Sequence, residues 1–238
     1  EFYPGTALGD ITSNSIDSFI RDPANISFNT TQPKSYEFTQ TTGSNKGIIT
    51  VSNEGTLPTL ADNYTILMWA YLDSSLTGQN NRVNMLSFGT GDYNNMVSIS
   101  KIRGGIGDYV FAQISNGGIS PSYYTDLNIG SSSNDTGQWL QIAVTRSGSD
   151  LKLYLNADLA DSGSFPGSGS GSTSETELII GAGYDMDVYG NVISMVGEIA
   201  IVKVYDTALT ENEIETSYTS LRQRFSLPVL TPTRTATQ

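Results

Sequence analysis

Two runs of alternating apolar and polar residues lie close together between Gly137 and Leu159. In each run the apolar side chains stand at every second position: Leu140, Ile142 and Val144, then Leu151, Leu153 and Leu155. A side-chain period of two predicts a strand with one buried face. The polar residues 146–150 between the runs include one glycine and predict a hairpin loop. The sequence therefore predicts a β-hairpin whose apolar face packs against a second sheet.

Further strand-like runs occur along most of the chain. They cover residues 35–40, 47–52, 64–73, 83–90, 96–102, 108–115, 176–183 and 194–206. Many short strands separated by Gly, Asn and Ser turns predict an all-β sandwich or barrel. The run at 64–73 is unusually apolar, so we expect it near the middle of a sheet. The Gly/Ser-rich residues 162–174 are expected to form a hairpin loop.

One short helix is predicted near the C-terminal end of the chain. Thr210 followed by Glu213 has the spacing of a capping box, which marks the start of a helix. Apolar residues then recur at helical spacing, at Ile214, Tyr218, Leu221 and Phe225. Such a stripe predicts a helix with one buried face, and we expect it to pack on the edge of the sandwich.

The two ends of the chain differ from its middle. Residues 1–34 are irregular, and the short alternations around Ile20 and Phe28 predict either strands or an arm that lies on the domain or on a neighbouring molecule. Residues 228–238 are rich in Thr and Pro and predict a tail or linker. We therefore expect an N-terminal arm over 1–34, a sandwich over 35–227 and a tail over 228–238.

Composition excludes several classes of function. The 238 residues include 12 Lys and Arg against 24 Asp and Glu, which gives a formal net charge of −12. This charge disfavours binding to nucleic acid. The chain has no cysteine and no histidine, so it lacks disulfides, thiolate metal sites and the side chain most often used as a general base. No apolar run is long enough for membrane insertion.

Four Asn-x-Ser/Thr motifs are candidate N-glycosylation sites, at Asn25, Asn29, Asn63 and Asn134. A chain rich in Ser, Thr and Asn produces such motifs by chance, so each one by itself is a weak signal. Together with the low content of charged residues, they favour a glycoprotein located outside the cell, on the cell surface or on a virion.

Four segments resemble, in order, the laminin-G-like, concanavalin A-like jelly-roll domains. They are YTILMWAYLD (64–73), GQWLQIAVTRSGSDLKLYLNADL (137–159), ELIIGAG (177–183) and VGEIAIVKVYDTALTENEI (196–214). The resemblance spans residues 35 to 215 and implies two antiparallel sheets packed face to face, with Trp69 and Trp139 in packing positions. Asn156-Ala157 stands where the family usually has Asp-Gly, so we expect a looser turn there.

The family includes lectins, adhesion modules, pentraxin-like binders and glycoside hydrolases, so the fold does not decide the function. Its hydrolases carry paired carboxylates on one strand, as Glu-x-Asp-x-x-Glu or Glu-x-Asp-x-Glu. Neither pattern occurs here, and Glu198 is followed by four apolar residues. A retaining glycosidase needs two nearby carboxylates, so the sequence predicts a protein that is not an enzyme.

Two acidic loops are candidate calcium sites, since oxygen ligands suffice for this cation. One contains Asp185, Asp187 and Asn191, and the other contains Asp92. Laminin-G-like domains often hold calcium at a rim with such side chains, which is what the resemblance implies for these loops. The alternative for each is a solvated polar turn.

Tyrosines beside these acidic loops, and two more in the predicted loop at 119–126, are candidate ligand-binding residues, because aromatic faces stack on sugar rings. They are Tyr93, Tyr123, Tyr124, Tyr184 and Tyr189. The alternative for most of them is ordinary packing.

These observations predict an extracellular, non-catalytic jelly-roll module. In our first hypothesis it is a structural or adhesive subunit of a surface fibre, appendage or shell, and forms homopolymers partly through the arm at 1–34. The alternative is a lectin-like recognition module that binds carbohydrate or protein, with or without calcium. A glycoside hydrolase is the remote alternative.

Overall fold

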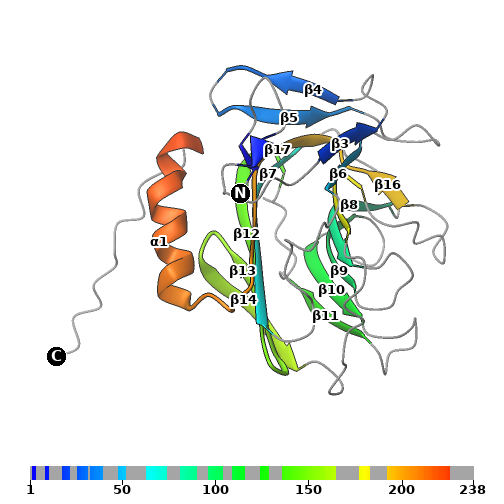
Figure 1. Cartoon of the computed structure of the whole chain (residues 1–238). Helices are drawn as coiled ribbons and strands as arrows, with labels where there is room; N and C mark the ends of the chain where they lie inside the picture. Colours follow the sequence, from blue (N-terminus) through cyan, green and yellow to red (C-terminus); the bar gives the residue numbers. More distant parts are fainter. Residues whose placement is uncertain are drawn as a thin grey trace.

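The alternating runs fold into strands of two antiparallel sheets, as predicted. The computed structural model describes residues 2–3, 9–10, 18–21, 26–31, 33–39, 48–51, 63–73, 81–89, 96–103, 109–115, 124–128, 136–164, 177–182 and 192–225. The two sheets lie face to face, with the helix on the outer side of the first sheet (Figure 1). The prediction of a jelly-roll sandwich with one short C-terminal helix is therefore confirmed.

The first sheet is built around the most apolar strand. Its order is β14 (Asp158–Ser164), β13 (Asp150–Leu155), β12 (Trp139–Ser147), β7 (Asn63–Leu72), β17 (Gly197–Tyr205), β1 (Phe2–Tyr3) and β2 (Gly9–Asp10). A further pair, β4 (Ile26–Asn29) and β5 (Ser35–Phe38), joins this sheet through the pairing of β5 with β17. Strand β7 pairs with β12 on one side and β17 on the other, so its central place is confirmed.

The second sheet faces the first across the core. Its order is β11 (Tyr124–Asn128), β10 (Tyr109–Ser115), β9 (Met96–Arg103), β8 (Asn81–Gly89), β15 (Glu177–Ile180), β6 (Ile48–Val51) and β3 (Ser18–Arg21), with β16 (Val192–Ser194) parallel to β8. A β-bulge in β8 leaves Met85 between the paired residues Asn84 and Leu86. Because of this extra residue, Met85 and Leu86 both belong to the core.

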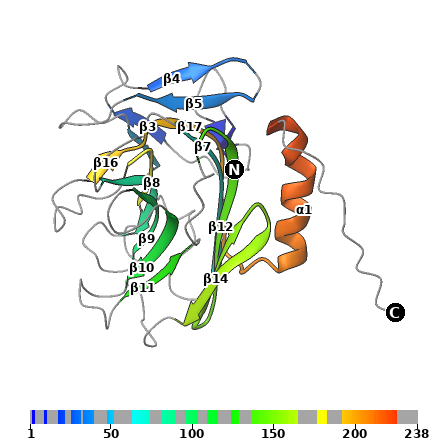
Figure 2. The same ribbon diagram turned by 180° about the vertical axis from the view of Figure 1, so that it is seen from behind.

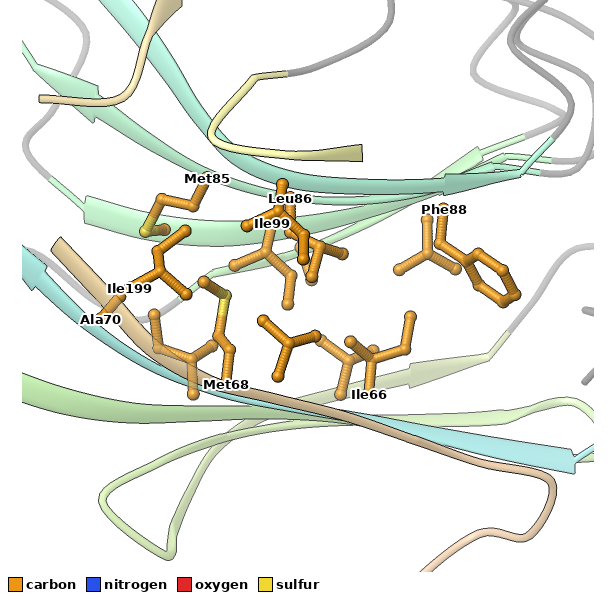
Figure 3. Close-up of a cluster of buried hydrophobic side chains, with 14 of the residues drawn as sticks. Ile66, Met68, Ala70, Met85, Leu86, Phe88, Ile99 and Ile199 are labelled. Atoms are coloured by element: carbon orange, nitrogen blue, oxygen red, sulfur yellow. The ribbon is translucent and has the colours of Figure 1, made fainter. Parts of the chain in front are cut away.

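The main core lies between the two sheets. Figure 3 shows Ile66, Met68 and Ala70 of β7 facing residues of the second sheet, among them Leu86 and Ile99. All of these side chains are fully buried. Burial of one large aliphatic side chain contributes about 1.5–3 kcal/mol to stability, so this interior is the main source of cohesion between the sheets.

The strands in the described parts of residues 1–34 belong to this chain's own sheets. β1 pairs with β17, β3 pairs with β6 and β4 pairs with β5. The strand alternative around Ile20 and Phe28 is thus confirmed. Residues 226–238, which include the predicted tail, lie outside the described residues.

The predicted helix exists, but it does not pack on the edge of the sandwich. α1 (Glu211–Leu221) begins with the predicted capping box at Thr210, and a 3₁₀ turn (Arg222–Phe225) follows it. The helix covers the outer face of the first sheet (Figures 1 and 2). The reason is that β7 is apolar on both faces, and Leu67 and Trp69 on its outer face need a cover.

Both turns of the β12–β13–β14 region are tighter than predicted. Ser147 pairs with Asp150, so the first loop has only Gly148 and Ser149 between the strands. The second turn has only Asn156 and Ala157 between the paired residues Leu155 and Asp158. The expectation of a looser turn at Asn156-Ala157 is therefore wrong. Likewise, residues 162–164 of the predicted Gly/Ser loop extend β14.

Candidate functional site

Most of the site residues predicted from the sequence lie outside the described part of the chain. These are the candidate calcium ligands Asp92, Asp185, Asp187 and Asn191, the tyrosines Tyr93, Tyr123, Tyr184 and Tyr189, and the glycosylation candidates Asn25 and Asn134. The backbone of Tyr124 begins β11 and pairs with Ser115. Calcium binding and tyrosine stacking therefore stay predictions.

The two remaining glycosylation candidates have different surroundings. Asn29 is half-buried in β4, and its amide donates a hydrogen bond to the carboxylate of Glu198 at 3.2 Å. Asn63 is exposed at the start of β7, and its Oδ1 accepts a hydrogen bond from the backbone N–H of Gly148 at 3.0 Å. Of these two side chains, Asn63 is the more open to solvent.

A cleft of about 540 Å³ lies between α1 and the turn that joins β13 to β14. In both views of the molecule this turn lies beside the helix (Figures 1 and 2). We call this space the helix–turn cleft. Its lining residues are Asn156, Ala157, Asp158, Leu159, Glu211, Asn212, Glu215, Tyr218, Thr219 and Arg222.

The wall on the sheet side is a strained two-residue turn. Asn156 has φ = 52° and Ala157 has φ = 74°, which is the left-handed region that two-residue hairpin turns require at both positions. Asn156 is held in place because its Oδ1 accepts from the N–H of Gln141 at 3.0 Å and its own N–H donates to the carbonyl of Gln141 at 2.8 Å. These bonds fix the turn against β12, so this wall of the cleft is rigid.

The wall on the helix side is one face of α1. Glu211, Glu215, Tyr218 and Arg222 follow one another at spacings of four, three and four residues, which places them on the same side of the helix. The capping box fixes where this helix begins, because the N–H of Thr210 donates to the Glu213 carboxylate at 2.8 Å. Packing of Tyr218 against the indole of Trp69, at a ring separation of 5.7 Å, holds the face against the sheet.

Arg222 is the most unusual residue of the cleft. It is only 8% exposed, yet its Nε–H has no hydrogen-bond partner among the described residues. Its guanidinium carbon lies 6.0 Å from the centre of the Tyr218 ring, within the range of a cation–π contact. A buried donor without a partner costs free energy, so an acceptor that reaches the guanidinium of Arg222 from the cleft would relieve this cost.

Two opposite charges act on the hydroxyl of Tyr218. Burial raises the pKa of Tyr218 above its ordinary value of 10.0, while Arg222 lowers that pKa and Asp158 raises it. The phenol is therefore neutral near pH 7 and can donate a hydrogen bond. Because both charges influence the same hydroxyl, Arg222 and Asp158 belong to the same end of the cleft.

The apolar part of the cleft comes from the turn wall. Ala157 packs against the second apolar cluster, which lies between the first sheet and the helix. Leu159 is 44% exposed, and it is the large apolar side chain that stands out as exposed among the residues the structure describes. The cleft therefore offers carboxylates, amides, one guanidinium, one phenol and an apolar contact to a ligand.

A family model described as Concanavalin A-like lectin/glucanases superfamily matches residues 20–215. The match covers well over half of the 238 residues. The chain belongs to the concanavalin A-like lectin/glucanase superfamily. This membership agrees with the resemblance seen in the sequence, and the match also includes residues 20–34. No curated protein sequence matches the chain.

Solved structures similar to this superfamily member include binding domains of botulinum neurotoxins. The receptor binding domain of the C/D mosaic serotype has a TM-score of 0.70 at 15% identity and matches 92% of this chain and 50% of that one. The binding domain of neurotoxin DC in complex with SialylT has a TM-score of 0.70 at 13% identity, with the same coverage. A third structure is described by the finding that cell entry of botulinum neurotoxin type C is dependent upon interaction with two ganglioside molecules. It has a TM-score of 0.68 at 14% identity, and the match again covers 92% of this chain and 50% of that one.

At these identities the likeness shows a shared fold. The chain spans about half the length of these neurotoxin domains. The ligands of those proteins are therefore not transferred to this chain by the fold itself.

Since the superfamily includes glucanases, paired carboxylates are the relevant test for catalysis. Glu198 is followed by four apolar residues along β17, but Glu37 of β5 lies directly opposite it across the sheet. Glu37 accepts a hydrogen bond from Ser27 at 2.8 Å, and Glu198 accepts from Asn29 and Ser35. The two carboxylates therefore lie opposite each other on neighbouring strands, and each accepts hydrogen bonds from nearby side chains.

Two further findings concern the described residues as a whole. Within them, no group of three or more Asp, Glu, His or Cys side chains has the arrangement of a metal site. No helix in this part of the chain combines the length and apolar character needed to cross a membrane.

Proposed function

We propose that this domain is a non-catalytic recognition module that binds carbohydrate in the helix–turn cleft. The observation that carries the proposal is Arg222, which lines the cleft and whose buried Nε–H lacks a partner among the described residues. Carboxylates and amides line the same space. Superfamily membership supports the proposal, because the superfamily includes lectins.

Carbohydrate suits the cleft because sugar hydroxyls both donate and accept hydrogen bonds. Asp158, Glu211 and Glu215 can accept from them, and Arg222 and the neutral phenol of Tyr218 can donate to them. Leu159 and Ala157 supply contact for the C–H groups of a sugar ring. A volume of about 540 Å³ lies in the range of about 300–1,000 Å³ that is usual for small-ligand sites.

The neurotoxin domains add support of a second kind. One of them is described in complex with SialylT and another by its interaction with gangliosides, so the fold occurs in proteins that bind glycans. A location outside the cell follows as part of the proposal, because glycans of this kind are displayed there. Self-association through residues 1–34 stays a prediction. Of the two hypotheses, the comparisons favour the recognition module over the structural subunit.

A glycan array probed with the intact chain tests this function. We expect binding to a limited set of glycans, and we expect Arg222→Gln and Glu215→Gln to reduce it by about tenfold or more, since each removes a charged hydrogen-bonding group. Gln223→Ala is the matched control, because Gln223 is exposed on the 3₁₀ turn and does not line the cleft.

Two results would contradict the proposal. Absence of binding to any glycan would count against carbohydrate recognition. Glycan binding that is unchanged in both cleft variants would place the binding site elsewhere on the domain. Thermal unfolding of each variant shows whether a loss of binding reflects a loss of folding.

A further inference from the structure

We infer that the helix–turn cleft selects glycans that carry a carboxylated sugar, and that the carboxylate binds the guanidinium of Arg222. This inference rests on the proposed function and adds the chemical class of the ligand. It comes from the contrast between Arg222, which is buried, and the acidic side chains of the cleft, which are exposed.

A buried guanidinium favours a carboxylate over a neutral hydroxyl. Taking a charge out of water is costly unless an opposite charge or several hydrogen bonds compensate for it. The Nε–H of Arg222 is unused, and its nearest described aromatic partner, Tyr218, offers only a ring face at 6.0 Å. A carboxylate can accept two parallel N–H bonds from a guanidinium, which a single hydroxyl cannot do.

The two glutamates of the cleft, Glu211 and Glu215, do not cancel this preference, because they lie farther along the helix. With a rise of about 1.5 Å per residue, Glu211 lies roughly 16 Å and Glu215 roughly 10 Å from Arg222 along the axis. Both separations exceed the Debye length of about 8 Å at physiological ionic strength. Both glutamates are also exposed to solvent, so their repulsion of an anion at Arg222 is weak.

The cleft therefore has a basic end and an acidic end. The carboxylated sugar lies at the end of Arg222 and Tyr218, where the neutral phenol can donate a further hydrogen bond. The next sugar lies toward Glu215 and Glu211, whose carboxylates accept from its hydroxyls. This polarity sets the direction in which a glycan chain occupies the cleft.

Asp158 is the one carboxylate at the basic end. It influences the same Tyr218 hydroxyl as Arg222 does, so it opposes the approach of an anionic ligand. Removal of the Asp158 carboxylate should strengthen the binding of a carboxylated sugar. For a neutral sugar, the same change removes a carboxylate that accepts hydrogen bonds from its hydroxyls. Asp158→Asn thus separates the two ligand classes by the direction of the change.

The test compares methyl glucuronoside, its methyl ester and methyl glucoside as ligands of the intact chain. Binding is followed by NMR through the side-chain Nε–H signals of the arginines. We expect glucuronoside to bind about tenfold or more tightly than the ester or the glucoside. Arg222→Gln should remove this difference, and Arg222→Lys should retain part of it because the charge remains.

Two further variants complete the experiment. Asp158→Asn should raise the affinity for glucuronoside several-fold, and high salt should lower it. Arg224→Gln should change nothing, because Arg224 stands on the same 3₁₀ turn but does not line the cleft. Equal thermal stability of the variants shows that each one folds.

The outcomes separate this inference from the proposed function. Equal affinities for the three ligands, with binding still reduced by Arg222→Gln, would overturn the carboxylate preference and leave carbohydrate recognition standing. If none of the three ligands shifts a signal of the cleft and the glycan array is also negative, both proposals are wrong.

Discussion

The rings of Trp69 and Phe225 stack with their centroids 4.1 Å apart and their planes 9° from parallel. Phe225 belongs to the 3₁₀ turn after α1, and Trp69 lies on the outer face of β7. Trp139 of β12 also meets Phe225, at 4.9 Å. This contact attaches the C-terminal helix to the sheet, and with it one wall of the helix–turn cleft.

We predict that Phe225→Ala lowers the free energy of unfolding by about 3 kcal/mol or more, the usual cost of removing a buried aromatic ring. The two tryptophans of the chain, Trp69 and Trp139, both belong to the apolar cluster between the first sheet and α1 that contains Phe225. Denaturant unfolding followed by their fluorescence therefore measures the effect directly. Gln223→Ala, on the exposed side of the same turn, is the control and should change the free energy little.

Gly181 occupies a position that excludes a side chain. Its φ of +89° lies in the left-handed region, and a Cβ there would collide with the ring of Phe38. We predict that Gly181→Ala destabilises the fold by about 3 kcal/mol or more. Gly148 also has positive φ, at +60°, but has open space around it. Gly148→Ala should cost only about 1–2 kcal/mol. Equal losses in the two variants would contradict the role of Phe38.

Ala157 adopts a strained backbone conformation that glycine adopts without strain. It holds φ = 74° at the second position of a two-residue turn. We predict that Ala157→Gly stabilises the domain by about 0.5–1 kcal/mol, since glycine adopts this conformation without strain. The companion variant Asn156→Ala should instead destabilise it, because the hydrogen bond from Gln141 to the Asn156 side chain is lost. Urea unfolding of both variants is the measurement, and a destabilised Ala157→Gly would show that the methyl group matters more than the strain.

Glu213 makes the start of α1 sensitive to acid. Hydrogen bonds from the backbone and side chain of Thr210 hold its pKa below the ordinary value of 4.5. Because the folded pKa is the lower one, the stabilisation is complete above pH 4.5 and is lost as the pH falls through the folded value. NMR titration of the Glu213 carboxyl should show the lowered pKa, and Thr210→Ala should bring it back only part of the way toward 4.5, because the backbone N–H of residue 210 still donates to the carboxylate. An unchanged titration in Thr210→Ala would contradict the contribution of the Thr210 hydroxyl.

Calcium binding is the prediction that depends entirely on sequence. If the loops with Asp92 and with Asp185 and Asp187 bind calcium, the ion should raise the melting temperature relative to EDTA, because a ligand that binds the folded state stabilises it. Asp185→Asn combined with Asp187→Asn should remove most of the shift. Calorimetry without heat, together with an unchanged melting temperature, would refute the hypothesis.

The local patterns of the sequence predicted many elements of this fold, but not strand β11, nor the division of the predicted strand 194–206 between β16 and β17. The alternation around Val144 and Leu153 specifies a hairpin, and the pair Thr210 and Glu213 specifies the start of a helix, because each signal depends on residues close together in the chain. The packing role of Trp69 and Trp139 was also predicted correctly, from the resemblance of their segments to a known family.

Only the tertiary structure shows which residues, distant in the chain, the strands and the helix bring together. Glu37 lies opposite Glu198 across a sheet, and Asp158 and Arg222 line one cleft. Neither pair leaves a local signal, because strand register alone sets Glu37 opposite Glu198, and docking of the helix alone sets Asp158 and Arg222 around one cleft. The sequence by itself thus determined a lectin-like sandwich without a catalytic motif. The docking of α1 on the outer face of β7, driven by burial of Trp69, decided where that sandwich has a cleft.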